Sequence, residues 1–149
     1  MTNIDRSRVV MHAGVVLLVG LFCGYPTLVE TLGGDAERLW RTAHEALIMI
    51  GILLLAMASA FPSIALPRRE ATGLVWSLIA GAYGFAIGLV ISGIVGVQAF
   101  GPSRSPLVMI AFVGNATGIL GSMTAAILLI VGARAAIASA RPLVPGETR

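Results

Sequence analysis

The residues of this chain that could carry chemistry are few, and the best-placed group surrounds His44. Positions three and four apart in a helix share a face, so Trp40, Arg41 and His44 are predicted to lie together, and Gly51 continues that face two turns later. These groups would suit a flat anionic cofactor such as haem. His44 would act as metal ligand to the iron, Arg41 would pair with a propionate, and Gly51 would leave room for the ring.

A membrane interface is the simpler interpretation of the same residues. Trp, Arg and His are common where a helix meets the lipid headgroups. Arg41 could merely pair with Glu37 and Glu45, which lie four residues before and after it. Spacing alone favours this second interpretation.

Three polar side chains inside apolar segments are weaker candidates. Tyr83 falls within the third such segment, and Asn115 and Ser122 fall within the fourth, where Gly118 shares their face. Tyr83 and Asn115 could hydrogen-bond a substrate oxygen during a rearrangement and would then be catalytic. They could equally bond between helices at a modest gain in stability. The residues alone favour the structural role.

The second histidine, His12, is predicted to lie far from the first. His12 falls near the start of the first apolar segment and His44 near the start of the second. Consecutive spanning helices start on opposite sides of a bilayer, so the two imidazoles are expected to be nearly a membrane thickness apart, roughly 30 Å. The two therefore cannot hold one metal ion within a chain, which disfavours a bis-histidine cytochrome b made by a single subunit.

Four long apolar segments must position these residues. Hydrophobic residues make up 57% of the 149 positions and charged residues only 11%, whereas about a quarter of a soluble domain is charged. The segments are each long enough to span a bilayer, and they cover about 9–32, 43–66, 72–97 and 107–133. We predict an all-α integral membrane protein, an antiparallel bundle of four transmembrane helices. It would form one domain over 1–141, followed by a disordered tail at 142–149.

The charges predict how the bundle is oriented. All ten basic residues are arginines, and they are scattered over ends and loops without interleaved aromatics, so we expect no nucleic-acid partner. The N-terminus, the second loop and the tail share seven of them: Arg6, Arg8, Arg68, Arg69, Arg134, Arg141 and Arg149. The other side has three: Arg38, Arg41 and Arg104. This bias predicts cytoplasmic termini, in a membrane that we take to be the bacterial inner membrane.

Lines of small residues predict close helix packing. They recur at four-residue spacing in three segments: Gly20 and Gly24; Gly84, Gly88, Ser92 and Gly96; Gly114 and Gly118. In lipid such lines let helix backbones approach each other, because packing replaces the hydrophobic effect. We expect them to pack within the bundle. Four thin helices bury little between them, so a homo-oligomer that shares these seams is also predicted.

With these residues placed, the chain resembles the small four-helix membrane isomerases typified by styrene oxide isomerase and hydroxylaminobenzene mutase. The resemblance covers nearly the whole chain in length and helix order, through short motifs. These are His12-Ala13-Gly14 after a basic residue, Arg41-Thr42-Ala43-His44 with an exit at Phe61-Pro62, and Phe100-Gly101-Pro102 after the third segment.

The resemblance implies a specific chemistry on a small apolar aromatic substrate taken from the lipid bilayer. Styrene oxide isomerase is a haem b protein whose iron acts as a Lewis acid and converts an aryl epoxide into an aldehyde. The family's axial histidine maps onto His44. The mutase branch instead rearranges an aryl hydroxylamine to an aminophenol. The family usually has an Asn-Gly pair after the histidine, where this chain has Ile50-Gly51. Its third helix carries a Tyr or Asn, near Tyr83 or Phe85 here.

Two other classes of function stay open. A non-catalytic membrane scaffold or subunit is compatible with the glycine lines and with the missing Asn. A small dimeric transporter would need a carboxylate inside a helix as its proton and substrate switch. The nearest candidate, Glu30, is predicted to sit near a helix end, which argues against transport.

Overall fold

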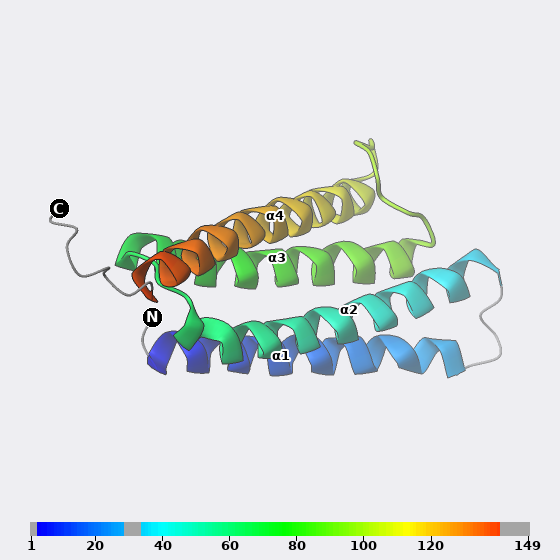
Figure 1. Ribbon diagram of the computed structural model, residues 1–149. Coiled ribbons are helices and arrows are strands. Elements are labelled where there is room, and N and C mark those ends of the chain that lie inside the picture. The colour runs from blue at the N-terminus through cyan, green and yellow to red at the C-terminus, as the bar shows by residue number, and fades with distance from the viewer. Residues whose placement is uncertain (1–2, 29–33, 141–149) are drawn as a thin grey trace, which may run out of the picture.

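The fold consists of α-helices and short 3₁₀ turns in the part of the chain that the computed structural model describes, residues 3–28 and 34–140. The elements follow in this order: α1 (Asn3–Gly24), η1 (Tyr25–Leu28), α2 (Asp35–Ala60), η2 (Phe61–Ser63), α3 (Arg68–Val95) and α4 (Pro106–Ala140) (Figure 1). All four α-helices are long and apolar enough to cross a membrane, which confirms the predicted all-helical membrane fold. Glu30 and the predicted tail at 142–149 lie outside the described residues.

The helices extend beyond the apolar segments that identified them. α1 begins at Asn3 rather than near Val9, and α2 begins at Asp35 rather than near Ala43. The added turns are polar, and in α2 they carry Asp35 and Glu37, whose negative charge is favourable at a helix N-terminus. Hydropathy therefore located the lipid-crossing part of each helix and not its ends.

Proline and glycine mark where the helices stop and start. α1 gives way to a 3₁₀ turn that contains Pro26, α2 ends before Pro62, and Pro106 opens α4, where a missing N–H costs nothing. Gly96 adopts φ 69° as the left-handed cap of α3, and its N–H donates to the Ser92 carbonyl. The prediction that Gly96 belongs to the small-residue seam is therefore wrong, because this residue ends the helix.

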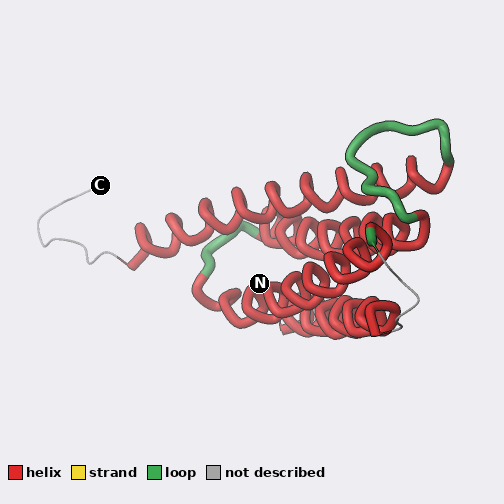
Figure 2. The backbone as a smooth tube through the Cα atoms, turned by 90° about the vertical axis from the view of Figure 1, so that its right-hand side faces the viewer, coloured by secondary structure: helices red, strands yellow, loops and turns green. Residues whose placement is uncertain are grey.

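The helices pack as two pairs joined through α3. α1 lies beside α2 and α3 beside α4, and α3 also contacts both α1 and α2 (Figures 1 and 2). Half of the most apolar stretch of α3 is buried (50%), against 17% for α4. α3 is thus the central helix, and α4 is the one most open to lipid.

The small residues of α3 pack directly on those of α4. An added Cβ at Gly84 would lie 2.6 Å from the Gly118 nitrogen and 2.7 Å from the Gly114 oxygen, closer than real Cβ atoms come. The approach predicted from the four-residue spacing is thus made within the chain. These positions are occupied, so a homo-oligomer, which stays a prediction, would have to use other faces of the bundle.

Candidate functional site

The imidazole of His44 is held by two small residues of α1. Its Nδ1 lies 2.8 Å from the carbonyl oxygen of Gly20, and since a carbonyl only accepts, Nδ1 carries the hydrogen. An added Cβ at Gly24 would lie 2.9 Å from the same nitrogen, so this glycine leaves the space that the ring fills. Nε2 then keeps its lone pair, which is the usual state of a metal-ligating histidine.

The other predicted cofactor residues on the first turns of α2 face elsewhere. Arg41 donates to Glu37 in an exposed ion pair, one of the two pairings foreseen from the sequence. The indole of Trp40 lies against Gly93 of α3, where an added Cβ would be 3.0 Å from the ring. Trp40 therefore contacts α3 while His44 contacts α1, and the helical spacing did not bring their rings together.

The space expected at Gly51 is filled from within the chain. An added Cβ there would lie 2.5 Å from Cγ of Leu17, so the Leu17 side chain occupies the gap. Of the residues predicted to hold haem, His44 offers Nε2 as a ligand for the iron. These residues do not form a slot for the haem ring between Trp40, Arg41 and Gly51.

His12 and Tyr83 form a pair that the sequence did not predict. His12 Nδ1 lies 3.0 Å from the Tyr83 hydroxyl, although the residues are 71 positions apart. Their rings meet edge to face, with centroids 5.5 Å apart and an angle of 83° between the planes. Both side chains are half-buried within membrane-spanning helices. A polar pair at this depth is a functional candidate.

The two histidines are nearer to each other than the sequence suggested. His44 contacts α1 at Gly20, eight residues beyond His12, which is about 12 Å along the helix axis. The expected separation of roughly 30 Å is therefore wrong, because α1 and α2 begin earlier than their apolar segments and both histidines lie further into the helices. The imidazoles still bond to different groups and share no metal position.

An apolar groove of about 410 Å³ runs between α3 and α4, and Tyr83 forms part of its wall. We call it the α3–α4 groove. Its other walls are aliphatic or small and include Ile87 of α3 and Met109, Val113 and Thr117 of α4. A site that is largely apolar with a few placed polar groups is typical of pockets for small apolar molecules.

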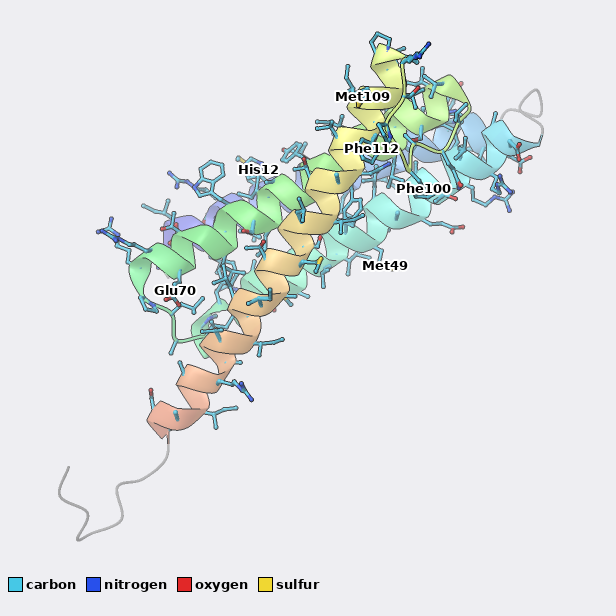
Figure 3. All side chains as sticks on the ribbon, turned by 90° about the horizontal axis from the view of Figure 1, so that it is seen from above. His12, Met49, Glu70, Phe100, Met109 and Phe112 are labelled. Carbon is cyan, nitrogen blue, oxygen red and sulfur yellow. The ribbon has the colours of Figure 1, made fainter. Side chains whose placement is uncertain are left out.

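A second apolar groove of about 410 Å³ lies on the opposite flank of α4, and we call it the α2–α4 groove. Met49 and Phe100 line it, and seen from above they lie across α4 from His12 (Figure 3). Asn115 lines it too, and its Nδ2 donates to the Ala99 carbonyl at 3.3 Å. The two predicted catalytic residues, Tyr83 and Asn115, thus lie in different grooves.

The Asn115 side-chain oxygen is buried without a partner. No hydrogen bond to Oδ1 is found within the described ranges, and the atom lies over Gly88, in the space that an added Cβ would need. Ile50 and Phe85 line the same groove. An unsatisfied buried acceptor of this kind is unusual in a folded protein and calls for a donor.

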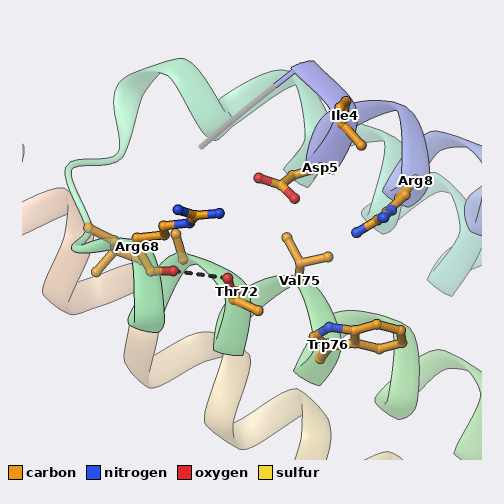
Figure 4. Close-up of a pocket in the computed structure, with 9 residues that line it drawn as sticks. Ile4, Asp5, Arg8, Arg68, Thr72, Val75 and Trp76 are labelled. Carbon is orange, nitrogen blue, oxygen red and sulfur yellow. Dashed lines mark hydrogen bonds between the residues drawn. The ribbon is translucent and has the colours of Figure 1, made fainter.

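A third cavity, of about 460 Å³, is charged and lies where the N-terminal ends of α1 and α3 meet. The Asp5 carboxylate lies between the guanidinium groups of Arg8 and Arg68, with Trp76 beside them (Figure 4). Arginines and an indole at helix ends are typical of a membrane boundary. The charged first turns of α1 and α3 thus lie together at one end of the bundle.

Comparison with known proteins identifies the family of this chain. A family model described as styrene oxide isomerase matches residues 5–134. That range contains His12, His44, Tyr83 and Asn115. No curated protein and no solved structure matches the chain.

Proposed function

Because the chain belongs to the styrene oxide isomerase family, we propose that it is a membrane-embedded isomerase that converts a small apolar aryl epoxide into an aldehyde. The observation that carries this proposal is Tyr83, whose hydroxyl lies 3.0 Å from His12 Nδ1 and which also forms part of the wall of an apolar groove. The bilayer delivers such substrates, since they dissolve in lipid.

The reaction needs little from the protein beyond polarising one oxygen. The bond from oxygen to the aryl-bearing carbon breaks, a hydride moves to that carbon from its neighbour, and the oxygen becomes the aldehyde carbonyl. No atom is gained or lost. A hydroxyl aimed at the oxygen stabilises the charge that develops on it. An apolar wall keeps out water, which would otherwise capture the cationic carbon.

Tyr83 is the residue of this chain that donates to the epoxide oxygen. The aliphatic wall of Ile87, Met109 and Val113 holds the aryl group and excludes water. Volume supports the assignment, because about 410 Å³ falls within the range of roughly 300–1,000 Å³ for small-molecule sites.

Haem b is the proposed cofactor, and His44 would hold it through Nε2. When bound, its iron would supply a Lewis acid for the epoxide oxygen. The bond from Nδ1 to the Gly20 carbonyl supports this ligand, because it fixes the tautomer and the plane of the ring. His44 and Tyr83 contact α1 about 12 Å apart along its axis. The two contacts therefore lie on different turns of α1, and His44 is not part of the wall of the α3–α4 groove.

A second candidate reaction is the rearrangement of an aryl hydroxylamine to an aminophenol, in the α2–α4 groove. The specific observation that favours it is the unpartnered oxygen of Asn115. An epoxide offers only acceptors, whereas a hydroxylamine has N–H and O–H donors that such an oxygen can accept. Ile50, at the position where the family usually has Asn, lines this groove with Asn115, so Asn115 could supply the missing amide.

The topology proposed with this function is antiparallel, with both termini in the cytoplasm of a bacterium. The arginine bias and the shared cavity at the N-terminal ends of α1 and α3 support it. A reporter enzyme fused after Arg149 should be active only in its cytoplasmic form. Activity of a periplasmic reporter at that position would contradict this topology.

The proposed function is tested by presenting the purified, haem-supplemented protein with a panel of aryl epoxides and aryl hydroxylamines. We expect an aryl acetaldehyde from a terminal aryl epoxide, identified by its mass and retention time. Conversion of hydroxylamines alone would move the proposal to the second reaction. If every member of the panel were recovered unchanged, the scaffold interpretation would replace both.

A further inference from the structure

We propose that His12 is the positioning residue for Tyr83: its Nδ1–H donates to the phenol oxygen and leaves the Tyr83 O–H free to donate to a substrate oxygen in the α3–α4 groove. This inference rests on the proposed isomerase function. It gives a role in the reaction to α1, a helix that forms none of the walls of that groove.

The contact between the two rings is specific enough to fix the phenol. The hydrogen bond of 3.0 Å sets the distance, and the edge-to-face contact at 83° sets the orientation. Among the described residues, neither side chain makes another hydrogen bond. His12 lies on the helical face of α1 that carries Val9, Ala13 and Val16, all fully or almost fully buried. The imidazole is thus anchored on a packed helix face.

Two tautomers of His12 are possible, and they leave different donors unmet. If Tyr83 donated to Nδ1, the unmet donor would be Nε2–H of His12, on a helix that does not line the groove. If Nδ1–H donates to Tyr83, the unmet donor is the phenol O–H, on a residue that does line it. An epoxide is only an acceptor, so the second tautomer is the one that serves the reaction.

The chain offers matched variants that separate this hydrogen bond from the space it occupies. Asn at position 12 places an amide nitrogen where the imidazole has Nδ1, whereas Gln places its amide one bond further out. Phe keeps an aromatic ring at this position but has no ring nitrogen. His12→Asn should therefore preserve the bond to Tyr83, and His12→Gln and His12→Phe should lose it.

The first readout needs no substrate. The sequence has two tyrosines, so Tyr83 is the only tyrosine that remains after Tyr25→Phe. In ultraviolet resonance Raman spectra of this full-length variant in detergent, the tyrosine bands then come from Tyr83 only. The intensity ratio of the tyrosine doublet distinguishes a phenol that accepts a hydrogen bond from one that donates. We expect the accepting ratio in the Tyr25→Phe parent and after His12→Asn, and the ratio of an unbonded phenol after His12→Phe and His12→Gln.

The second readout is turnover of an aryl epoxide in the same variants. His12→Phe should lower kcat by about 10- to 100-fold with little change in KM, since a displaced phenol loses alignment and not the apolar contacts. His12→Asn should restore most of kcat.

A donating or unchanged doublet after His12→Phe would overturn the pairing, whether or not the enzyme is active. Equal kcat in all variants would overturn the role in the reaction. If the parent itself rearranged no substrate, the proposed function and this role would both fail, while the spectra would still decide the pairing.

Discussion

Tyr83→Phe is expected to lower kcat for an aryl epoxide by about 100-fold or more, the cost of removing one donor from a site of developing negative charge. The phenyl ring keeps the wall of the α3–α4 groove intact, so KM should change little. Loss of the hydroxyl also leaves His12 Nδ1 without its partner. That loss should cost stability by only about 0.6 kcal/mol, the average for such bonds between helices in membranes.

Tyr25→Phe is the matched control. Tyr25 belongs to the 3₁₀ turn after α1, is 69% exposed and lines neither groove. The kcat of Tyr25→Phe should therefore equal that of the unsubstituted protein. The measurement is initial aldehyde formation by the two variants at matched protein and haem content. Equal rates for Tyr83→Phe and the parent would remove Tyr83 from the reaction. A loss confined to Asn115→Leu would instead place the chemistry in the α2–α4 groove.

Periodicity in the sequence was sufficient to identify the helices and the faces on which their small residues pack. The four apolar segments became α1 to α4, and the lines containing Gly84 and Gly114 became the contact between α3 and α4. Such features are local, since a run of apolar residues or a four-residue repeat can be read within one helix. The ends shifted because polar turns add to a helix without adding to its hydropathy.

The pairing of side chains between helices could not be read in the same way. Helical spacing predicted that Trp40 and His44 share a face of α2, but α2 touches α3 on one side and α1 on the other. The two rings are directed to Gly93 and Gly20 respectively. His12 meets Tyr83 only because α1 also contacts α3. No spacing within a single segment encodes which helices become neighbours.

The prediction that Gly51 leaves room for the haem ring also depended on which helices become neighbours. A glycine beside a candidate ligand can leave space for a cofactor or for a neighbouring side chain, and the sequence does not say which. Here Leu17 of α1 reaches across and fills it. The glycine that shapes the surroundings of His44 is Gly24, which lies on another helix and was predicted only as part of a packing seam.

Haem binding should therefore depend on Gly24 as well as on His44. The added Cβ of Gly24→Ala would lie 2.9 Å from Nδ1 and 3.1 Å from Cε1 of the imidazole, so the ring must move away from the Gly20 carbonyl. Without that hydrogen bond the tautomer and the ring plane are no longer fixed. Loss of such a supporting contact typically costs 10- to 100-fold in affinity for a bound metal. His44→Ala should abolish the Soret band of the purified protein.

Gly14→Ala separates this effect from a general response of α1 to substitution. An added Cβ at Gly14 meets no atom within 4 Å, and alanine favours a helix over glycine by about 1 kcal/mol. Haem titrations followed at the Soret band should thus give equal affinities for Gly14→Ala and the parent, and an affinity about 10- to 100-fold lower for Gly24→Ala. If Gly24→Ala bound haem as tightly as Gly14→Ala, the ligand would not be an imidazole fixed against α1. A Soret band that survived His44→Ala would move the ligand to another residue and leave His44 with its hydrogen bond between α1 and α2.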